Sequence, residues 1–430
     1  MSSATTLTFL SLGNPTGLKF IVEHGGLRAI FDFGREHAPG RALFSLGLVP
    51  RPGRELADEL AVGIAPKLSG VYDAWDGRTA VFLSHLHLDH SGLVHHLHPD
   101  VPLYYPAAME PLRAAVEGSG YLPWRRPPGT QVADGATVGG GELSVQFLAV
   151  DHDLPGASGF LVRTPELALA FTGDHRWHGS HPELTAAFAQ AARGADVLVQ
   201  EGVTLGAPPP GATPLSEHQV WAGFERLLLE RTSGLVIVNA YPMNRERVAA
   251  FAAACERHGR RFLMEAQAAQ IAGYPGVLTD PGGVAADPAG HCLQLGFGGL
   301  PSLIDLQPPP GSVYVHSDGA PMGPFDPAWT VMEAWLARFG LEFVGLGSTG
   351  HSWPEDIVRM VQAVRPGLVV PVHSRSPEAL EVPGVPRLLA EPQRPYAAAE
   401  LKALARQLFA RAAGPTPSAH GGDPAPSGRT

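Results

Sequence analysis

The chain has 430 residues, more than one typical domain of about 100–200 residues, which predicts two domains. Apolar residues make up 44% of the chain and charged residues 17%, so a large core can be buried and wholesale disorder is excluded. The formal net charge of −10 excludes a uniformly basic surface, so any nucleic-acid partner would need a local basic groove.

Cysteine usage and hydropathy narrow the class further. Two cysteines are too few for a disulfide framework or a cysteine-rich zinc module. The first residues lack a basic segment followed by an apolar one, and no run of about 18 apolar residues is free of charged or turn residues. We therefore expect a soluble, cytoplasmic α/β protein with no signal peptide and no membrane span.

Hydrophobic runs in the first half predict short strands separated by turn residues. The predicted strands are 27–34, 80–85, 143–150, 159–164, 167–174 and 195–202, with an alanine-rich helix near 184–193. From residue 203 strands and helices alternate, which is typical of a parallel sheet flanked by helices. The elements predicted there are helix 217–231, strand 234–240, helix 245–258 and strands 261–265 and 312–316. Ser216 and Gln219 form a capping box that opens the first of these helices.

The later segments are less regular. The stretch 273–310 is rich in glycine and proline and predicts an irregular excursion. A strand–helix–strand unit follows over 341–372, with Pro354 in the first turn of its helix. Residues 413–430 are again rich in glycine and proline and are predicted to be a disordered tail.

Four side chains of the metal-ligand type fall within six positions at the end of the predicted strand 80–85. His85, His87, Asp89 and His90 form an HxHxDH motif. Residues two apart in an extended chain face the same side, so His85 and His87 can hold one metal ion together. Asp89 and His90 fall on the following turn and can present ligands to a second ion. A single histidine is more often a surface or core residue, but four ligand types at this spacing indicate a metal site that suits Zn²⁺ or Mn²⁺.

Two ions need more ligands, and candidates lie at the ends of later strands. They are His152, Asp174 and His373. Ligands at the ends of successive strands converge on one edge of a sheet, as an active site requires. The remaining histidines near these positions are interpreted as loop or neighbouring residues and not as ligands: His95, His96, His98, His175, His178 and His181.

The order of these residues resembles the metallo-β-lactamase superfamily. The resemblance is carried by the HxHxDH motif, His152, the segment 172–174 (TGD) and the late segment 371–373 (PVH). It implies an α/β fold, an αββα sandwich with a dinuclear site. Residue by residue it implies one ion on His85, His87 and His152, a second on Asp89, His90 and His373, and Asp174 bridging the two. Asp32 matches the family's first acidic motif, which orients the site without binding metal.

Almost two hundred residues separate Asp174 from His373, which leaves room for an entire domain. This layout resembles the β-CASP nucleases, in which a small α/β domain is inserted into the metallo-β-lactamase fold. The resemblance implies a split metallo-β-lactamase domain over 1–202 and 346–412 and an inserted β-CASP domain over 203–345.

Further segments resemble ribonuclease J-like members of the β-CASP branch. The matching segments are 199–202, 213–217, 239–247, 259–260, 348–356 and 371–373. Glu201 stands at the acid of motif A, where these members usually have Asp, and His351 stands in motif B, which reads STGHS instead of SGHA. The segment 316–321 replaces a serine-rich loop, and only about fifty residues follow His373.

The resemblance implies a dinuclear-metal phosphodiesterase or nuclease, ribonuclease J-like, acting on single-stranded RNA. A hydroxide that bridges two divalent ions, Zn²⁺ or Mn²⁺, would attack the phosphodiester. The candidate catalytic residues are Asp89, His351 and Glu201, with His351 paired to Glu201 as general acid; a buried structural hydrogen bond is the alternative for that pair. The candidate phosphate contacts are Arg245, Ser348, Thr349, Gly350 and Ser352.

Other functions stay open. A metallo-hydrolase of a small phosphoester, ester or amide is favoured by the net charge and by the short segment after His373. A non-catalytic scaffold paired with an active partner is a third function, against which the full ligand set argues. A homo-oligomer is also open. Further candidates for nucleic-acid contact, with an exposed surface position as the alternative, are Arg247, Arg260, Arg261, Arg375 and the segment 124–126. For Arg260 and Arg261 an exposed position on a helix face is the favoured interpretation.

Overall fold

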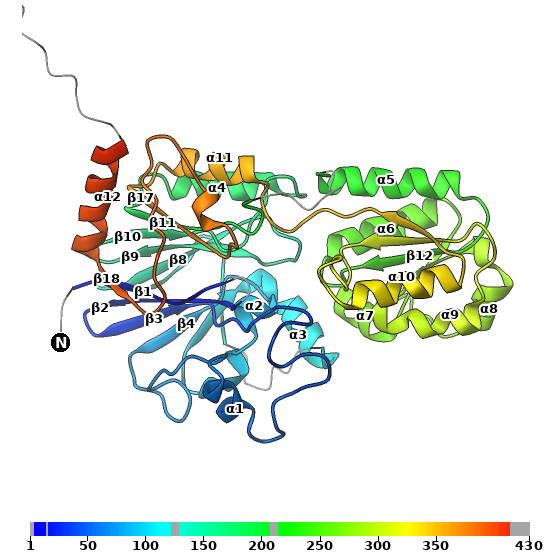
Figure 1. Ribbon diagram of the computed structural model, residues 1–430, viewed down its shortest axis with the longest axis horizontal. Coiled ribbons are helices and arrows are strands. Elements are labelled where there is room, and N and C mark those ends of the chain that lie inside the picture. Colours follow the sequence, from blue (N-terminus) through cyan, green and yellow to red (C-terminus); the bar gives the residue numbers. More distant parts are fainter. Residues whose placement is uncertain (1–3, 14–15, 122–128, 207–213, 413–430) are drawn as a thin grey trace, which may run out of the picture.

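The computed structural model describes residues 4–13, 16–121, 129–206 and 214–412 (Figure 1). Two sheets pack face to face, and a third sheet with its own helices lies beside them (Figure 1). The predicted disordered tail at 413–430 and the candidate segment 124–126 lie outside the described residues.

The first sheet has seven strands in the order β18-β1-β2-β3-β4-β5-β6. Their bounds are β1 Thr6–Leu12, β2 Leu18–His24, β3 Leu27–Phe31, β4 Thr79–Phe82, β5 Leu103–Pro106, β6 Thr130–Val132 and β18 Pro395–Ala397. β18, β1, β2 and β3 pair antiparallel, whereas β3 to β6 pair parallel. The parallel half therefore places the carboxyl ends of β3, β4 and β5 at one edge.

The second sheet has six strands in the order β17-β11-β10-β9-β8-β7. Their bounds are β7 Thr137–Gly139, β8 Ser144–Ala149, β9 Ser158–Arg163, β10 Ala168–Phe171, β11 Val197–Glu201 and β17 Leu368–Val372. β17 comes from the far end of the chain and pairs parallel with β11 along its whole length. This pairing returns the chain to the sandwich after the third sheet.

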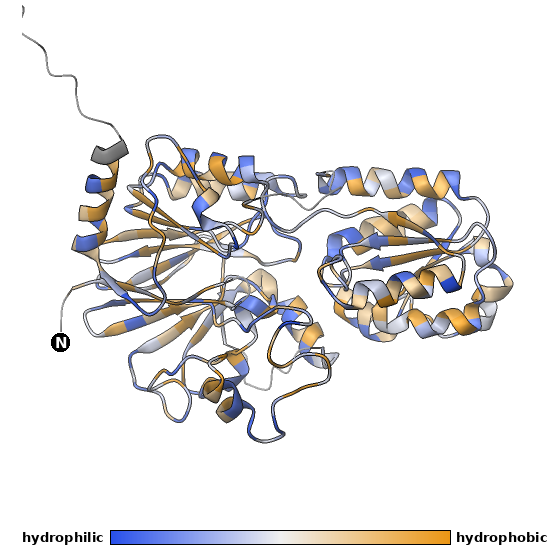
Figure 2. Ribbon diagram, in the orientation of Figure 1, coloured by the Kyte–Doolittle hydropathy of each residue, from blue (hydrophilic) through white to orange (hydrophobic). Residues whose placement is uncertain are grey.

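Aromatic rings fill the space between the two sheets. The ring of Phe20 stacks on Phe31 at 4.9 Å within the first sheet and meets Phe171 of the second sheet edge-on at 5.0 Å. The strands are largely apolar (Figure 2), and every second side chain along them, such as Leu18, Phe20 and Val22 in β2, belongs to this core. Helices α2 Leu88–Ser91 and α3 Glu110–Gly118 flank the outer face of the first sheet, and α4 Pro182–Ala191 and α11 Pro354–Val364 cover the second. The predicted αββα sandwich is confirmed.

The third sheet has five parallel strands in the order β13-β14-β12-β15-β16. Their bounds are β12 Val236–Ala240, β13 Arg261–Met264, β14 His291–Gln294, β15 Val313–Ser317 and β16 Glu342–Gly345. Its helices are α5 Glu217–Glu230, α6 Arg245–Arg257, α7 Ala266–Ala272, α8 Pro281–Ala286, α9 Leu303–Leu306 and α10 Ala328–Arg338. Apolar side chains of α5 and α6 pack on one face of this sheet and those of α10 on the other. The domain boundaries at 202, 203, 345 and 346 stay predictions.

Local sequence patterns predicted several elements of the third sheet and its helices, but they did not predict the strand β14. The predicted capping box is confirmed, since Ser216 and Gln219 exchange hydrogen bonds at the start of α5. The prediction of an irregular stretch at 273–310 is wrong at its centre, because β14 lies there between β13 and β12. β14 has four residues, three of them buried, and glycine and proline on both sides mask so short a run.

The remaining elements frame the sandwich. They are α1 Glu55–Ala61 and α12 Ala398–Ala412 and the 3₁₀ helices η1 Val94–His96, η2 Ala107–Met109, η3 Pro288–Gly290, η4 Phe297–Ser302 and η5 Pro377–Ala379. Among the helices within the described ranges, none combines the length and the apolar character that crossing a bilayer requires.

The aromatic core predicts a large stability effect for one residue. Replacing Phe20 by Ala removes a ring that is fully buried between the two sheets, and we expect a loss of about 3–5 kcal/mol in the free energy of unfolding. Denaturant unfolding of the sandwich followed by circular dichroism measures this loss. Leu27→Ala in β3 is the control, since Leu27 is 42% exposed and should change stability little. Equal effects of the two substitutions would contradict the assigned core.

Candidate metal centre

The HxHxDH motif lies in the turn between β4 and α2. Main-chain contacts dock this turn against the residues that follow β3, since the amide of Phe33 donates to the carbonyl of His90. Gly34 lies beside this contact, and a Cβ atom there would stand 1.6 Å from the carbonyl oxygen of Asp89. Only glycine permits this approach of the two backbones, so Gly34 sets where the motif sits.

The later candidates lie at one edge of the six-stranded sheet. β10, β11 and β17 are parallel neighbours, and β8 shares their direction because both β8 and β10 pair antiparallel with β9. The carboxyl ends of these strands therefore meet at the same edge. The side chains found there are His152, Asp174, Glu201 and His373.

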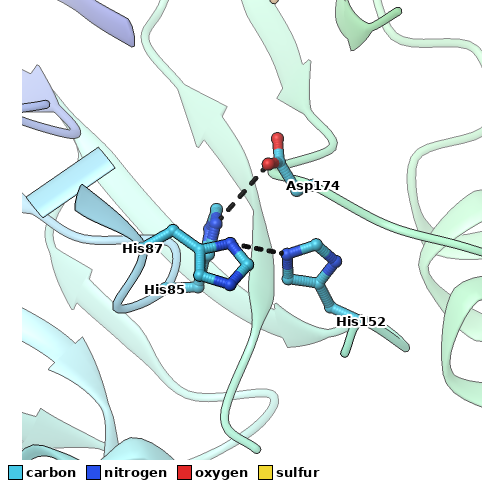
Figure 3. A group of neighbouring side chains, drawn as sticks. All are labelled: His85, His87, His152 and Asp174. Atoms are coloured by element: carbon cyan, nitrogen blue, oxygen red, sulfur yellow. Dashed lines mark hydrogen bonds and ion pairs between the residues drawn. The ribbon is translucent and has the colours of Figure 1, made fainter. Parts of the chain in front are cut away.

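The seven predicted ligands fall into groups whose nitrogen and oxygen atoms lie within 4.8 Å of one another. The first group is His85, His87, His152 and Asp174, which Figure 3 shows converging from separate loops. The second group is Asp89, His90 and His373, and a third is Asp174, His351 and His373. Ligation by each residue stays a prediction, and the clusters are compatible with divalent metal ions.

Asp174 stands between the first two groups. Its Oδ2 lies 3.5 Å from Nε2 of His85, 3.1 Å from Nε2 of His90 and 3.5 Å from Nε2 of His373. These separations match those between neighbouring ligands of one ion, about 3.3 Å for ligand bonds of about 2.0–2.1 Å. One carboxylate thus faces imidazoles of both groups, which is the arrangement that a bridging ligand needs.

Unsatisfied polar atoms test whether metal ions fit these groups. Nε2 of His85, Nε2 of His90 and both carboxylate oxygens of Asp174 are buried, and none has a hydrogen-bond partner among the described residues. Buried polar atoms are almost always hydrogen-bonded in folded proteins, and leaving them unpaired is costly. Four such atoms aimed at one another form a donor set that divalent cations would satisfy.

Neighbouring acceptors orient the imidazoles. Asp32 accepts from Nδ1 of His90 at 2.8 Å and from the amide of Ser84 at 2.7 Å. The carbonyl of Gly350 accepts from Nδ1 of His152 at 2.6 Å. In both histidines the other ring nitrogen, Nε2, is left facing the cluster, which fixes the tautomer that a metal ion requires. Asp32 thus occupies the orienting position expected of it.

Burial also keeps the first group in its ligating form. It lowers the pKa of His85 and His87 below the usual value and that of His152 to about 3. These imidazoles are therefore neutral near pH 7, and a neutral imidazole has the lone pair that binds metal.

His351 lies beside Glu201 at the solvent side of the cluster. Its Nδ1 is 3.6 Å from Oε2 of Glu201 and 3.7 Å from Oδ2 of Asp174, and its side chain is 19% exposed. Burial alone lowers the pKa of His351, but the carboxylates of Asp174 and Glu201 outweigh it and raise the pKa to about 9. Glu201 is fully buried and is held by the amides of Val203 and Ser352. A partly exposed, protonated imidazole is suited to proton donation.

The predicted phosphate contacts are engaged within the protein. The amide of Ser348 donates to Asp318, and the hydroxyl of Ser348 donates to a carbonyl. The hydroxyl of Ser352 bonds to His175, and the guanidinium of Arg245 donates to carbonyls of Ile271 and Pro111. A Cβ at Gly350 would lie 2.7 Å from atoms of His152 and Asp153, so this glycine allows close packing. Phosphate binding by Arg245, Ser348, Thr349, Gly350 and Ser352 stays a prediction.

Two arginines differ from their interpretation as groove or surface residues. Arg247 is 1% exposed and pairs with Glu217 at 2.7 Å and with Asp318 at 2.5 Å. Arg260 is 5% exposed and donates to three main-chain carbonyls, so its interpretation as an exposed helix residue is wrong. Burial forces each guanidinium to find acceptors inside the protein. Arg261, at the start of β13, is exposed as expected.

Sequence reasoning missed Asp153 at this site. Its Oδ1 lies 3.4 Å from Nε2 of His87 and 3.4 Å from Nε2 of His152. A second acid next to His152 in the segment VDHD was the available signal, but an acid in a loop is more often a turn former. Asp153 therefore adds a negative charge at the first group.

The geometry can now be compared with known proteins. A family model described as the metallo-beta-lactamase superfamily matches residues 20–228, the part that holds six of the seven predicted ligands. Over these residues the chain belongs to the metallo-beta-lactamase superfamily. The superfamily's mixed α/β fold agrees with the observed sandwich.

The proteins to which this chain is similar include ribonucleases J. Ribonuclease J of Mycobacterium tuberculosis (strain ATCC 25618 / H37Rv) is 24% identical over 350 residues, which cover 72% of this chain and 61% of that protein. Ribonuclease J of Pyrococcus abyssi is 32% identical over 108 residues, 24% of each chain. This chain thus spans less than two thirds of the length of either relative. A crystal structure of a protein of unknown function from Enterococcus faecalis V583 is 30% identical with a TM-score of 0.78, covering 92% of this chain and all of that one.

The place of Asp174 predicts the effect of neutralising it. Asp174→Asn removes the charge that faces both groups, and we expect metal affinity to fall by more than the about 10–100-fold typical of losing an outer partner. Metal content after equilibrium dialysis, measured by mass spectrometry, checks this. His96→Gln is the control, since His96 pairs with Glu59 outside the groups. A metal content of Asp174→Asn equal to that of the wild type would contradict a bridging role for Asp174.

A histidine outside the ligand groups predicts acid sensitivity. Burial lowers the pKa of His178 to about 4, against about 6.5 in the unfolded chain. Between these pH values the unfolded state binds more protons, so stability falls as the pH drops from 6.5 to 4, by up to about 3 kcal/mol. His178→Gln keeps a donor toward the carbonyl of Thr349 and should lose this part of the pH dependence. Denaturation midpoints of both proteins in chelator at pH 7 and 5 measure it; parallel curves would contradict burial as the cause.

Proposed function

We propose that this protein is a dinuclear-metal phosphodiesterase that cleaves RNA, a ribonuclease J-like member of the β-CASP branch. The observation that carries the proposal is the carboxylate of Asp174, which lies within 3.5 Å of imidazoles from two ligand groups. The similarity to ribonucleases J supports RNA as the substrate class. Zn²⁺ as the ion with Mn²⁺ as the alternative, single-stranded RNA as partner, a cytoplasmic location and a homo-oligomeric state stay predictions.

Named residues of this chain would hold the ions and supply the remaining chemistry. His85, His87 and His152 would hold one ion, with Asp174 shared. Asp89, His90 and His373 would hold the other. Divalent ions at such a centre supply Lewis acidity, which acidifies bound water and neutralises charge on a phosphodiester.

His351 would donate the proton to the departing oxygen. Its imidazole is partly exposed, at 19%, and Asp174 and Glu201 keep it protonated near pH 7. Glu201 cannot reach solvent and would therefore act by holding His351 in place and in its charged form. A positioned acid of this kind contributes about 10²–10⁴-fold to turnover.

A second candidate is hydrolysis of a small phosphoester, ester or amide at the same centre. One observation favours it: the guanidinium of Arg247 and the hydroxyls of Ser348 and Ser352, which a nucleic-acid groove would use, are bound to protein groups. The net charge of −10 also disfavours long-range attraction of a polyanion.

Incubation with 5′-phosphorylated single-stranded RNA in Zn²⁺ or Mn²⁺ separates the candidates. We expect cleavage by the wild type and loss of cleavage in Asp89→Ala, because Asp89 belongs to the second ligand group. Cleavage of bis(p-nitrophenyl) phosphate without cleavage of RNA would favour the small-substrate function. Identical behaviour of wild type and Asp89→Ala would end the nuclease proposal.

The acid role predicts a separate result for His351. We expect His351→Ala to lower turnover by about 10²–10⁴-fold while metal content stays at the wild-type value, because all seven predicted ligands remain in this variant. Turnover and metal content are measured on the same preparation. Loss of metal in His351→Ala would instead assign His351 to the third ligand group with Asp174 and His373.

A further inference from the structure

Five charges of alternating sign, four of them buried, connect the metal centre with the five-stranded sheet. We name Asp151, Arg176, Glu217, Arg247 and Asp318 the charge chain. Arg176 donates to Asp151 at 3.0 Å and to Glu217 at 2.9 Å. Arg247 donates to Glu217 at 2.7 Å and to Asp318 at 2.5 Å. Four of the five side chains are at most 2% exposed, and Asp318 is 34% exposed at the far end.

The two ends of the charge chain belong to different parts of the molecule. Asp151 and Arg176 lie next to the ligands His152 and Asp174, in loops that follow strands of the sandwich. The other three lie among the elements around the third sheet: Glu217 begins α5, Arg247 lies in the first turn of α6, and Asp318 follows β15.

The charge chain ends on the loop that carries His351. The amide of Ser348 donates to Oδ2 of Asp318 at 2.7 Å. Three consecutive carbonyls of the loop each accept from a different part of the protein. Arg247 donates to Ser348 O at 2.9 Å, His178 and Arg176 donate to Thr349 O at 3.0 and 3.5 Å, and His152 donates to Gly350 O at 2.6 Å.

A purely stabilising role does not account for this arrangement. Buried ion pairs often add little or no stability compared with well-packed apolar residues, so their presence is weak support for a stability function. Directional hydrogen bonds to successive carbonyls instead fix the position of one loop. That loop places His351 against Glu201 and Asp174.

We propose that Arg247 and Asp318 are positioning residues of the metal centre and do not themselves hold metal. Through the charge chain, the five-stranded sheet fixes the position of loop 348–352 and thereby the position of His351. The effect on turnover rests on the proposed function; the effect on the loop does not.

Asp318→Asn tests this with the least disturbance of the fold. The substitution keeps the size of the side chain, and asparagine tolerates the positive φ of 62° at this position. It removes the charge that holds both Arg247 and the Ser348 amide. Arg247→Met is the stronger second variant.

Arg260→Met is the matched control. Arg260 is also a buried arginine of the third sheet, at 5% exposure, and it donates to the carbonyls of Gly234, His291 and Arg231. None of these carbonyls belongs to loop 348–352. A general loosening of this part of the protein would therefore affect the control as much as the two test variants.

The measurements are hydrogen–deuterium exchange of peptides covering 346–352 in the metal-loaded protein, metal content, and kcat and KM on 5′-phosphorylated RNA. We expect Asp318→Asn and Arg247→Met to speed exchange in the loop about tenfold, as the loss of a charge-assisted hydrogen bond would do. We expect kcat to fall about tenfold or more with KM nearly unchanged, since the acid is misplaced and binding is kept. The metal content of both test variants should stay at the wild-type value, and so should all measured values of the control Arg260→Met.

Several results would overturn the proposal. The first is an unchanged exchange rate of the loop in both test variants. The second is a loss of bound metal in the variants whose loop exchange is faster. The third is an effect of Arg260→Met on exchange and turnover equal to that of the test variants. If the wild type cleaves no RNA, the proposed function fails, and the exchange and metal measurements still decide whether the charge chain positions the loop.

Discussion

The buried carboxylate of Asp174 is the group on which the site's arrangement depends. Both of its oxygens are buried and have no hydrogen-bond partner in the described part of the chain, while imidazoles from the HxHxDH turn and from the end of β17 surround it. A charge placed in this way is costly unless cations compensate it. The fold meets this requirement by ending β8, β10 and β17 at one edge and by docking the turn after β4 against Gly34.

The junction between the sandwich and the third sheet follows the same electrostatic logic. Arg176 and Arg247 are fully buried, and each lies between two carboxylates. Their remaining donors reach carbonyls of loop 348–352, so the two parts of the molecule are joined at the residues that surround His351. An arginine buried between two carboxylates serves as a structural cation. The presence of Arg247 in a segment that resembles ribonucleases J therefore does not by itself indicate phosphate binding.

Much of the fold could be predicted because its signals are local. Alternating or continuous apolar runs predicted the strands that became β3, β4, β8 to β13 and β15 to β17, and Ser216 with Gln219 predicted the start of α5. The strands β1, β2, β5, β6, β7 and β18, at or near the edges of the two sandwich sheets, were not predicted, and β14 was hidden among glycines and prolines. Strands at a sheet edge are stabilised by pairing with distant segments, such as β1 with β18, and a local window cannot detect that pairing.

For the site, the sequence by itself determined the types and the order of the predicted ligands, because HxHxDH places four donors within six positions and each later candidate comes within three residues of a strand end. Only the tertiary structure decided which charged side chains are paired inside the protein and which can contact a substrate. Arg247 and Glu217 are 30 residues apart in sequence yet 2.7 Å apart in space, and Asp153 lies 3.4 Å from His87 although the two are 66 residues apart. Coulomb attraction and desolvation depend on distance and burial in the folded molecule, and neither quantity is written in the residue type.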